Sequence, residues 1–132
     1  METEYYKTKE SVEEYIQLAK DVNGGALIEK LKSYLPSNSS VLEIGTGPGT
    51  DWKILNKDFT VVGSDNSAEF LNHLASANPS GKFLQLDATT LEIDEQFDGI
   101  YSNKVMHHLS DEELRSSIER QAEILATNGI VC

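Results

Sequence analysis

Three glycines at alternate positions, Gly45, Gly47 and Gly49, follow an apolar run that carries an acidic residue, Glu43. A backbone without Cβ atoms lets a ligand lie directly against the chain, and the first amides of a following helix point toward such a ligand. The polar residues after Gly49 are typical of a helix start. The stretch therefore predicts a strand that turns tightly into a helix and binds a nucleotide or nucleoside at the turn.

Carboxylates end two of the later apolar runs. Asp65 lies 20 residues after Gly45, the spacing at which an acidic residue accepts hydrogen bonds from ribose hydroxyls above such a turn. Asp87 ends the next run, and a fourth run leads to Asn103. The carboxyl ends of parallel strands meet in one crevice, so we expect the glycine turn, both carboxylates and Asn103 to line one site.

The residues within the turn favour a cation over a phosphate. The third glycine comes one place earlier than in the dinucleotide fingerprint G-x-G-x-x-G, and Pro48 removes an amide that a pyrophosphate would use. Glu43 would repel a diphosphate and attract a positive group. The turn therefore predicts a cationic nucleoside ligand that carries no phosphate.

The elements that must position these residues alternate along the chain. Helices are predicted at about 51–57, 67–77 and 110–125, the last one starting with a capping box formed by Ser110 and Glu113. Strands are predicted at 41–44, 59–65, 82–87, 97–102 and 130–132, the last one after a turn at Asn128 and Gly129. This alternation indicates an α/β fold, a doubly wound and mostly parallel sheet with helices on both faces.

Two amphipathic helices are predicted ahead of the sheet. Ser11 and Glu14 form a capping box that starts a helix running to about residue 21. The second helix covers 27–35 and ends at Pro36. They form an N-terminal helical part of the domain.

Composition limits the classes of partner. The chain has 132 residues, enough for one domain, and a net charge of −11 argues against nucleic acid because that affinity rests on Lys and Arg. No apolar run is long enough for a membrane span, and the polar N-terminus does not resemble a signal peptide. A single cysteine leaves neither an internal disulfide nor a cysteine cluster for a metal. We expect a cytoplasmic protein without a metal site.

The motifs together resemble those of class I S-adenosylmethionine-dependent methyltransferases. In that family an acidic residue precedes a G-x-G-x-G turn, as Glu43 does here, and the cofactor carries a sulfonium and an ammonium but no phosphate. The stretches at 61–67, 84–88 and 97–109 are similar to the family's second, third and fourth motifs, in that order. The last is most similar to small-molecule methyltransferases.

The resemblance implies S-adenosylmethionine as cofactor, S-adenosylhomocysteine as product and a Rossmann-like sheet of strand order 3-2-1-4-5. Asp65 would bind the ribose, with Asn66 facing the adenine edge. Asp87 would accept from the adenine amino group, and the amide of Ala88 would reach the ring. Ser102 and its neighbour Asn103 would touch the methionyl part and face the acceptor. The implied cofactor-binding residues are Glu43, Gly45, Thr46, Gly47, Gly49, Asp65, Asn66, Asp87, Ala88, Ser102 and Asn103.

Methyl transfer from a sulfonium is an in-line displacement, and alignment of the reacting atoms supplies most of the acceleration. A general base is needed only if the small-molecule acceptor must lose a proton. His107 and His108 are the candidates, with packing or solvated roles as the alternatives. Lys104 is either a contact for an acidic acceptor or a solvated side chain.

The family normally continues past the fifth strand, whereas this sequence stops at Cys132. We expect one incomplete methyltransferase domain over 1–132, with a helical cap at 1–35 and a cofactor-binding core at 36–132, and self-association through the exposed sheet edge. One alternative is a cofactor-binding module without turnover. Another is a nicotinamide-dependent oxidoreductase, against which the glycine spacing and Glu43 count.

Overall fold

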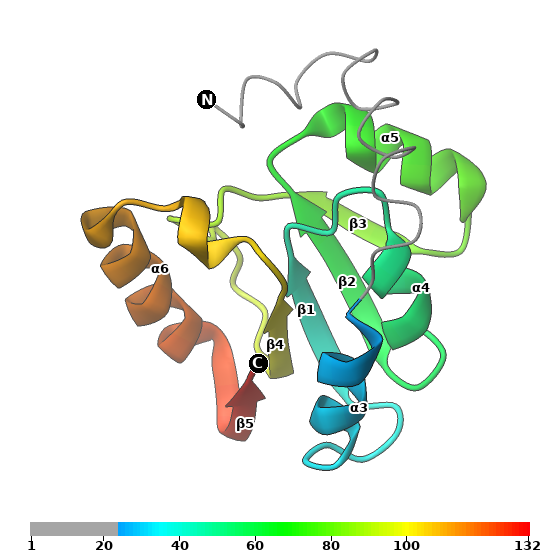
Figure 1. Ribbon diagram of the computed structural model, residues 1–132, viewed down its shortest axis with the longest axis horizontal. Coiled ribbons are helices and arrows are strands. Elements are labelled where there is room, and N and C mark those ends of the chain that lie inside the picture. The colour runs from blue at the N-terminus through cyan, green and yellow to red at the C-terminus, as the bar shows by residue number, and fades with distance from the viewer. Residues whose placement is uncertain (1–23) are drawn as a thin grey trace.

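The computed structural model describes residues 24–132, and a five-stranded sheet forms its centre (Figure 1). The strand order is β3-β2-β1-β4-β5 and every neighbouring pair is parallel, so the predicted fold class and strand order are confirmed. The strands are β1 (Ser40–Ile44), β2 (Thr60–Asp65), β3 (Lys82–Gln85), β4 (Phe97–Ser102) and β5 (Leu125–Val131).

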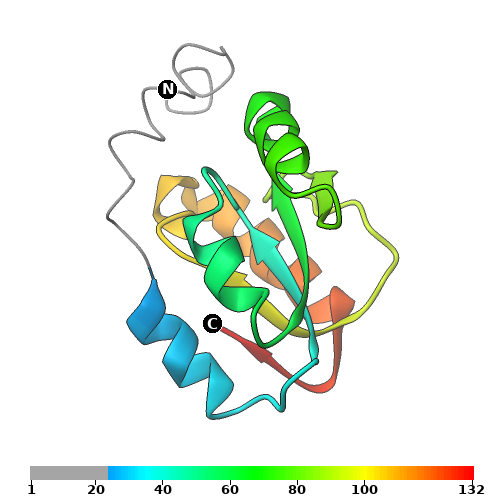
Figure 2. The same ribbon diagram turned by 90° about the vertical axis from the view of Figure 1, so that its right-hand side faces the viewer.

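Helices cover both faces of the sheet, as Figure 2 shows with α4 in front of the strands and α6 behind them. The helical elements are α3 (Gly25–Lys32), α4 (Thr50–Leu55), α5 (Ala68–Ala77), the short 3-10 helix η1 (Met106–His108) and α6 (Asp111–Ile124). The capping box predicted for α6 is present, because Ser110 accepts from the Glu113 amide while the Glu113 side chain accepts from the Ser110 amide.

Two apolar clusters form the core, one on each face. Successive residues of a strand point to opposite faces, and accordingly Val41 joins the cluster beneath α3 and α4 while Leu42 joins the one that includes Ile124 of α6. Trp52 of α4 lies in the first cluster and packs on Phe83 of β3, with 4.9 Å between ring centroids. Strand β1 is therefore buried on both faces, which holds the glycine turn at its end in a fixed place.

The end of the chain differs from the prediction. Helix α6 ends at Ile124 and β5 begins at once, whereas we expected helix to Leu125, a turn at Asn128 and Gly129, and a strand only from Ile130. The turn residues instead lie inside β5, where Asn128 has a φ of 65° and the pairing with β4 shifts register. A left-handed residue bends the strand without ending it, so this turn signal was misread.

Three other elements end at least two residues earlier than predicted. Helix α4 ends at Leu55, although the expected helix ran to about residue 57. Helix α3 ends at Lys32, although the expected helix ran to residue 35. Strand β3 ends at Gln85, which leaves Asp87 on the loop that follows. The helix predicted from residue 11 lies outside the described residues. Within residues 24–132, no helix is long and apolar enough to cross a membrane.

Candidate cofactor site

All three glycines of the turn after β1 adopt left-handed backbone angles, with φ of 72° at Gly45, 51° at Gly47 and 85° at Gly49. A Cβ at Gly45 would overlap the Val105 side chain, and a Cβ at Gly49 would overlap Leu74. A Cβ at Gly47 would meet nothing nearer than the Gly45 carbonyl oxygen at 4.0 Å. Packing thus requires glycine at positions 45 and 49, whereas Gly47 leaves open space above the turn.

Asp65, the last residue of β2, is bonded to this turn. One carboxylate oxygen accepts from the Gly47 amide at 2.9 Å, and the other accepts from the Ser67 amide at 2.8 Å. Burial raises the pKa of Asp65 above its ordinary value, although the amide hydrogen bonds oppose this. A carboxylate has about four lone-pair sites, so further donors can still bind it. The predicted approach of Asp65 to the glycine turn is therefore present.

Glu43 lies beneath the turn. Its side chain is 3% exposed, and its carboxylate accepts a hydrogen bond from the Thr46 hydroxyl, also buried. Burial raises the pKa of Glu43 from 4.5 to about 8, and the neighbouring Asp51 and Asp65 carboxylates add to this. The structure thus brings Glu43 and Thr46 together as the floor of the turn.

Asp51, in the first turn of α4, was missed by the sequence analysis. Its buried carboxylate accepts from the Gly24 amide at 2.7 Å, from the Tyr101 hydroxyl at 2.7 Å and from the Asn103 side-chain amide at 3.1 Å. Burial and then the Asp51 carboxylate raise the pKa of Tyr101. The available signal was an acidic residue two positions after Gly49. Acidic residues are common in the first turn of a helix, however, so this signal does not indicate which groups Asp51 contacts.

The loop after β3 carries Asp87 and Ala88. Asp87 is exposed, and one of its carboxylate oxygens accepts from the Thr89 amide at 2.7 Å. Ala88 packs against the apolar cluster on the α6 face. At the end of β2, Asn66 is exposed and its carbonyl accepts from the Gln85 side chain at 3.1 Å.

The segment after β4 places the remaining predicted residues. Ser102 pairs with Ile44 at the end of β1, so it lies next to the glycine turn, and Asn103 follows it to Asp51. His107 and His108 are exposed in η1 with ring centroids 4.0 Å apart. Their role as a base stays a prediction. Within residues 24–132, no group of three or more His, Cys, Asp or Glu side chains is placed to hold a metal.

Comparison with known proteins decides the family. The family described as "Methyltransferase domain" matches residues 41–129, which include the glycine turn and the ends of all four strands around it. The chain belongs to this family. In this methyltransferase domain, the glycine turn lies at the carboxyl end of β1, the edge at which open parallel sheets bind ligands.

The methyltransferase relatives are longer than this chain. It is 33% identical over 101 residues to an uncharacterized methyltransferase of Oceanobacillus iheyensis, OB1106, a match that covers 72% of this chain and 46% of the relative. It is also 33% identical over 101 residues to a trans-aconitate 2-methyltransferase of Variovorax paradoxus, with 74% and 38% covered. The chain thus spans less than half the length of these two relatives.

A solved structure of similar fold is the complex of DhpI with SAM and HEP. The two folds superpose with a TM-score of 0.83 at 23% sequence identity, and the match covers 98% of this chain and 62% of DhpI. At this identity the likeness concerns the fold, which agrees with the strand order found here.

Proposed function

We propose that the chain is the cofactor-binding part of an S-adenosylmethionine-dependent methyltransferase that acts on a small molecule. The observation that carries the proposal is the bond between the Asp65 carboxylate and the Gly47 amide, made in a chain of the methyltransferase domain family. That bond holds a carboxylate with spare lone pairs against the turn at Gly47, where no side chain fills the space, which suits a nucleoside ribose. The DhpI structure of similar fold is a complex with SAM.

The residues of the turn fit this cofactor better than a dinucleotide. Pro48 has no amide to offer a phosphate, and two acidic side chains near the turn, Asp51 and Asp65, favour a cation. Because Glu43 is buried and covered by Thr46, we propose that it supports the turn from below by its hydrogen bond with Thr46.

The other site residues act by holding the cofactor in one orientation. Asp87 and the amide of Ala88 bind the adenine, and Asn66 faces its edge. Ser102 and Asn103 bind the methionyl part. When bound, S-adenosylmethionine would supply a methyl group on its sulfonium sulfur, which leaves as a neutral thioether. The chain's contribution is to align this group with the acceptor and to exclude water.

The acceptor is proposed to be a small molecule, because the net charge of −11 disfavours nucleic acid. His107 or His108 serves as base if the acceptor must lose a proton. The relative named trans-aconitate 2-methyltransferase makes small carboxylic acids a reasonable first set of acceptors, with Lys104 as their contact. We also propose that the protein acts in the cytoplasm.

Calorimetric titration with S-adenosylhomocysteine, S-adenosylmethionine and NADH tests the cofactor. We expect the first two to bind and NADH not to bind. NADH binding without S-adenosylhomocysteine binding would overturn the proposal in favour of an oxidoreductase. A methyl-transfer assay with a panel of metabolites then tests turnover. Cofactor binding with no transfer to any acceptor favours a binding module.

A further inference from the structure

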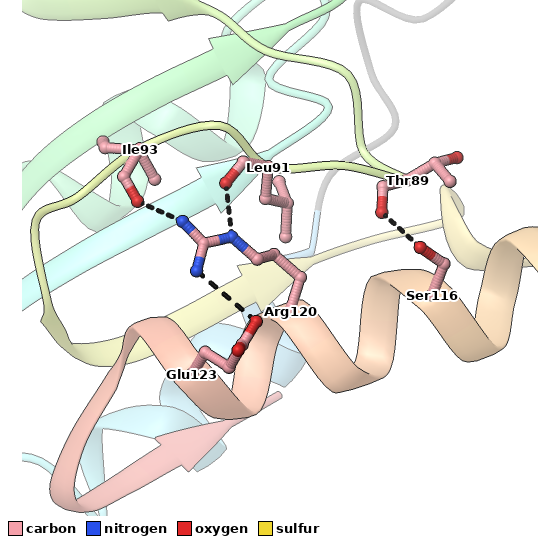
Figure 3. Close-up of polar contacts among 6 residues, drawn as sticks. All are labelled: Thr89, Leu91, Ile93, Ser116, Arg120 and Glu123. Carbon is pink, nitrogen blue, oxygen red and sulfur yellow. Dashed lines mark hydrogen bonds and ion pairs between the residues drawn. The ribbon is translucent and has the colours of Figure 1, made fainter.

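Arg120 of α6 holds the loop that joins β3 to β4 (Figure 3). Its Nε donates to the Leu91 carbonyl at 2.9 Å, and its Nη2 donates to the Ile93 carbonyl at 2.6 Å. The third guanidinium nitrogen lies 3.5 Å from the Glu123 carboxylate. One turn earlier on the helix, Ser116 donates to the Thr89 carbonyl at 3.2 Å. The same helix face thus binds three carbonyls of one loop.

The backbone of this loop is unusual at Leu91. Its φ is 41°, a left-handed angle that a leucine rarely adopts, and its side chain is fully buried. Such a conformation persists only where the surroundings hold it. Burial fixes the Leu91 side chain, and Arg120 fixes its carbonyl.

The loop connects Arg120 to Asp87. The Leu91 amide donates to the Asp87 carbonyl at 2.9 Å, and the Thr89 amide donates to the Asp87 carboxylate at 2.7 Å. The residues that Arg120 and Ser116 hold are therefore the same residues that orient Asp87. Hydrogen bonds within one turn of backbone therefore link Arg120 to Asp87.

We propose that Arg120 is a positioning residue that fixes the loop of Asp87 and Ala88 in the shape that selects adenine. The inference rests on the proposed function, since it assumes that this loop binds the base of S-adenosylmethionine. An arginine suits the task because its planar guanidinium directs donors to two carbonyls at once, whereas a lysine ammonium lacks that fixed geometry.

The test compares Arg120→Ala, Arg120→Lys and Arg115→Ala. Arg115 lies on the same helix and is exposed, so its substitution removes the same charge away from the loop. Each variant is titrated with S-adenosylhomocysteine and with S-inosylhomocysteine, in which a carbonyl replaces the adenine amino group. The ratio of the two dissociation constants measures recognition of that amino group and does not depend on the amount of folded protein.

We expect wild type and Arg115→Ala to prefer S-adenosylhomocysteine by about tenfold, the ratio that one hydrogen bond supplies. In Arg120→Ala the preference should fall to about twofold or less, with Arg120→Lys in between. Amide hydrogen exchange at Thr89 and Leu91, measured without ligand, should be faster in Arg120→Ala than in Arg115→Ala. If Arg120→Ala does not fold, Arg120→Lys and Ser116→Ala give the same comparison.

Three results would overturn the inference. If the Arg120 variants keep the wild-type ratio, or if wild type binds S-adenosylhomocysteine without preferring adenine, Arg120 does not position an adenine-reading loop, and the proposed function stands. If wild type binds neither compound, the proposed function itself fails and the inference fails with it.

Discussion

At the scale of single residues, Glu43 shows how burial changes what a carboxylate does. It accepts a hydrogen bond from Thr46, but burial shields it from solvent and raises its pKa to about 8. A folded-state pKa above the unfolded one gives stability that is fully present below about pH 4.5 and is lost as the pH rises through about 8. Near neutral pH this residue therefore lowers the unfolding free energy.

Glu43→Gln should remove this pH dependence, since glutamine keeps the oxygen that accepts from Thr46 and cannot ionise. Between about pH 5 and 8, the unfolding free energy of wild type should fall relative to that of Glu43→Gln by up to about 1.4 kcal/mol per pH unit. Urea unfolding at each pH measures this. The exposed Glu112→Gln should instead follow wild type. Parallel curves for wild type and Glu43→Gln would show that Glu43 is not buried as a protonated acid.

Asp51 is the second residue with a large expected effect. Asp51→Ala leaves three donors without their acceptor, those of Gly24, Tyr101 and Asn103, and should cost roughly 3 kcal/mol of unfolding free energy. Tyr101→Phe removes only one of the three bonds and serves as the matched control, with an expected cost of about 1 kcal/mol. Chemical denaturation measures both. Equal costs for the two variants would mean that the Asp51 carboxylate does not join three elements.

At the scale of elements, the turn between β1 and α4 tests the proposed site most directly. Gly47→Val places a branched side chain at a φ of 51°, which should cost roughly 1 to 2 kcal/mol of stability, but its Cβ has room. The protein should still fold, and affinity for S-adenosylhomocysteine should be lost because the side chain occupies the space above the turn. Calorimetry measures the affinity. Pro48→Ala, in the same turn, should bind within a few fold of wild type. Wild-type affinity in Gly47→Val would contradict the site.

Features that depend on residues close together in the sequence were predictable. Contacts between residues far apart in the sequence were not. The strand of β4 and the capping box of α6 are fixed by short patterns, and both were found as expected. The partners of Asp51 lie 27, 50 and 52 residues away, and Arg120 binds backbone carbonyls 29 and 27 residues away. No spacing rule reports such contacts, because backbone carbonyls are present at every residue and the fold alone decides which ones face a side chain.

At the scale of the whole molecule, both outer strands of the sheet expose an apolar side chain. Val131 of β5 is 51% exposed and Leu84 of β3 is 40% exposed. Among residues 24–132, no strand pairs with the outer edge of β5. An unpaired edge with apolar side chains is a template for pairing with another chain, and we predict self-association through β5. The net charge of −11 opposes it at low salt, so association should increase with ionic strength.

Sedimentation velocity over a concentration series tests this prediction. Val131→Lys should shift the protein toward monomer, since a charged edge residue disfavours strand pairing. Leu84→Lys places the same charge on the opposite edge and should leave the association of wild type unchanged. If both substitutions act equally, the effect is one of net charge, and the β5 edge is not the interface.

The packing of Trp52 provides an optical reporter of the site. It is the one tryptophan in the sequence, it follows Asp51 directly, and its buried indole N–H has no hydrogen-bond partner among the described residues. An indole shielded from water emits at shorter wavelength than a solvated one, so the fluorescence of the folded protein should be blue-shifted. A ligand that binds at the glycine turn should change the electric field and the solvent exposure within one helical turn of this ring. Its arrival can therefore be followed as a change in emission, in the unlabelled protein and in real time.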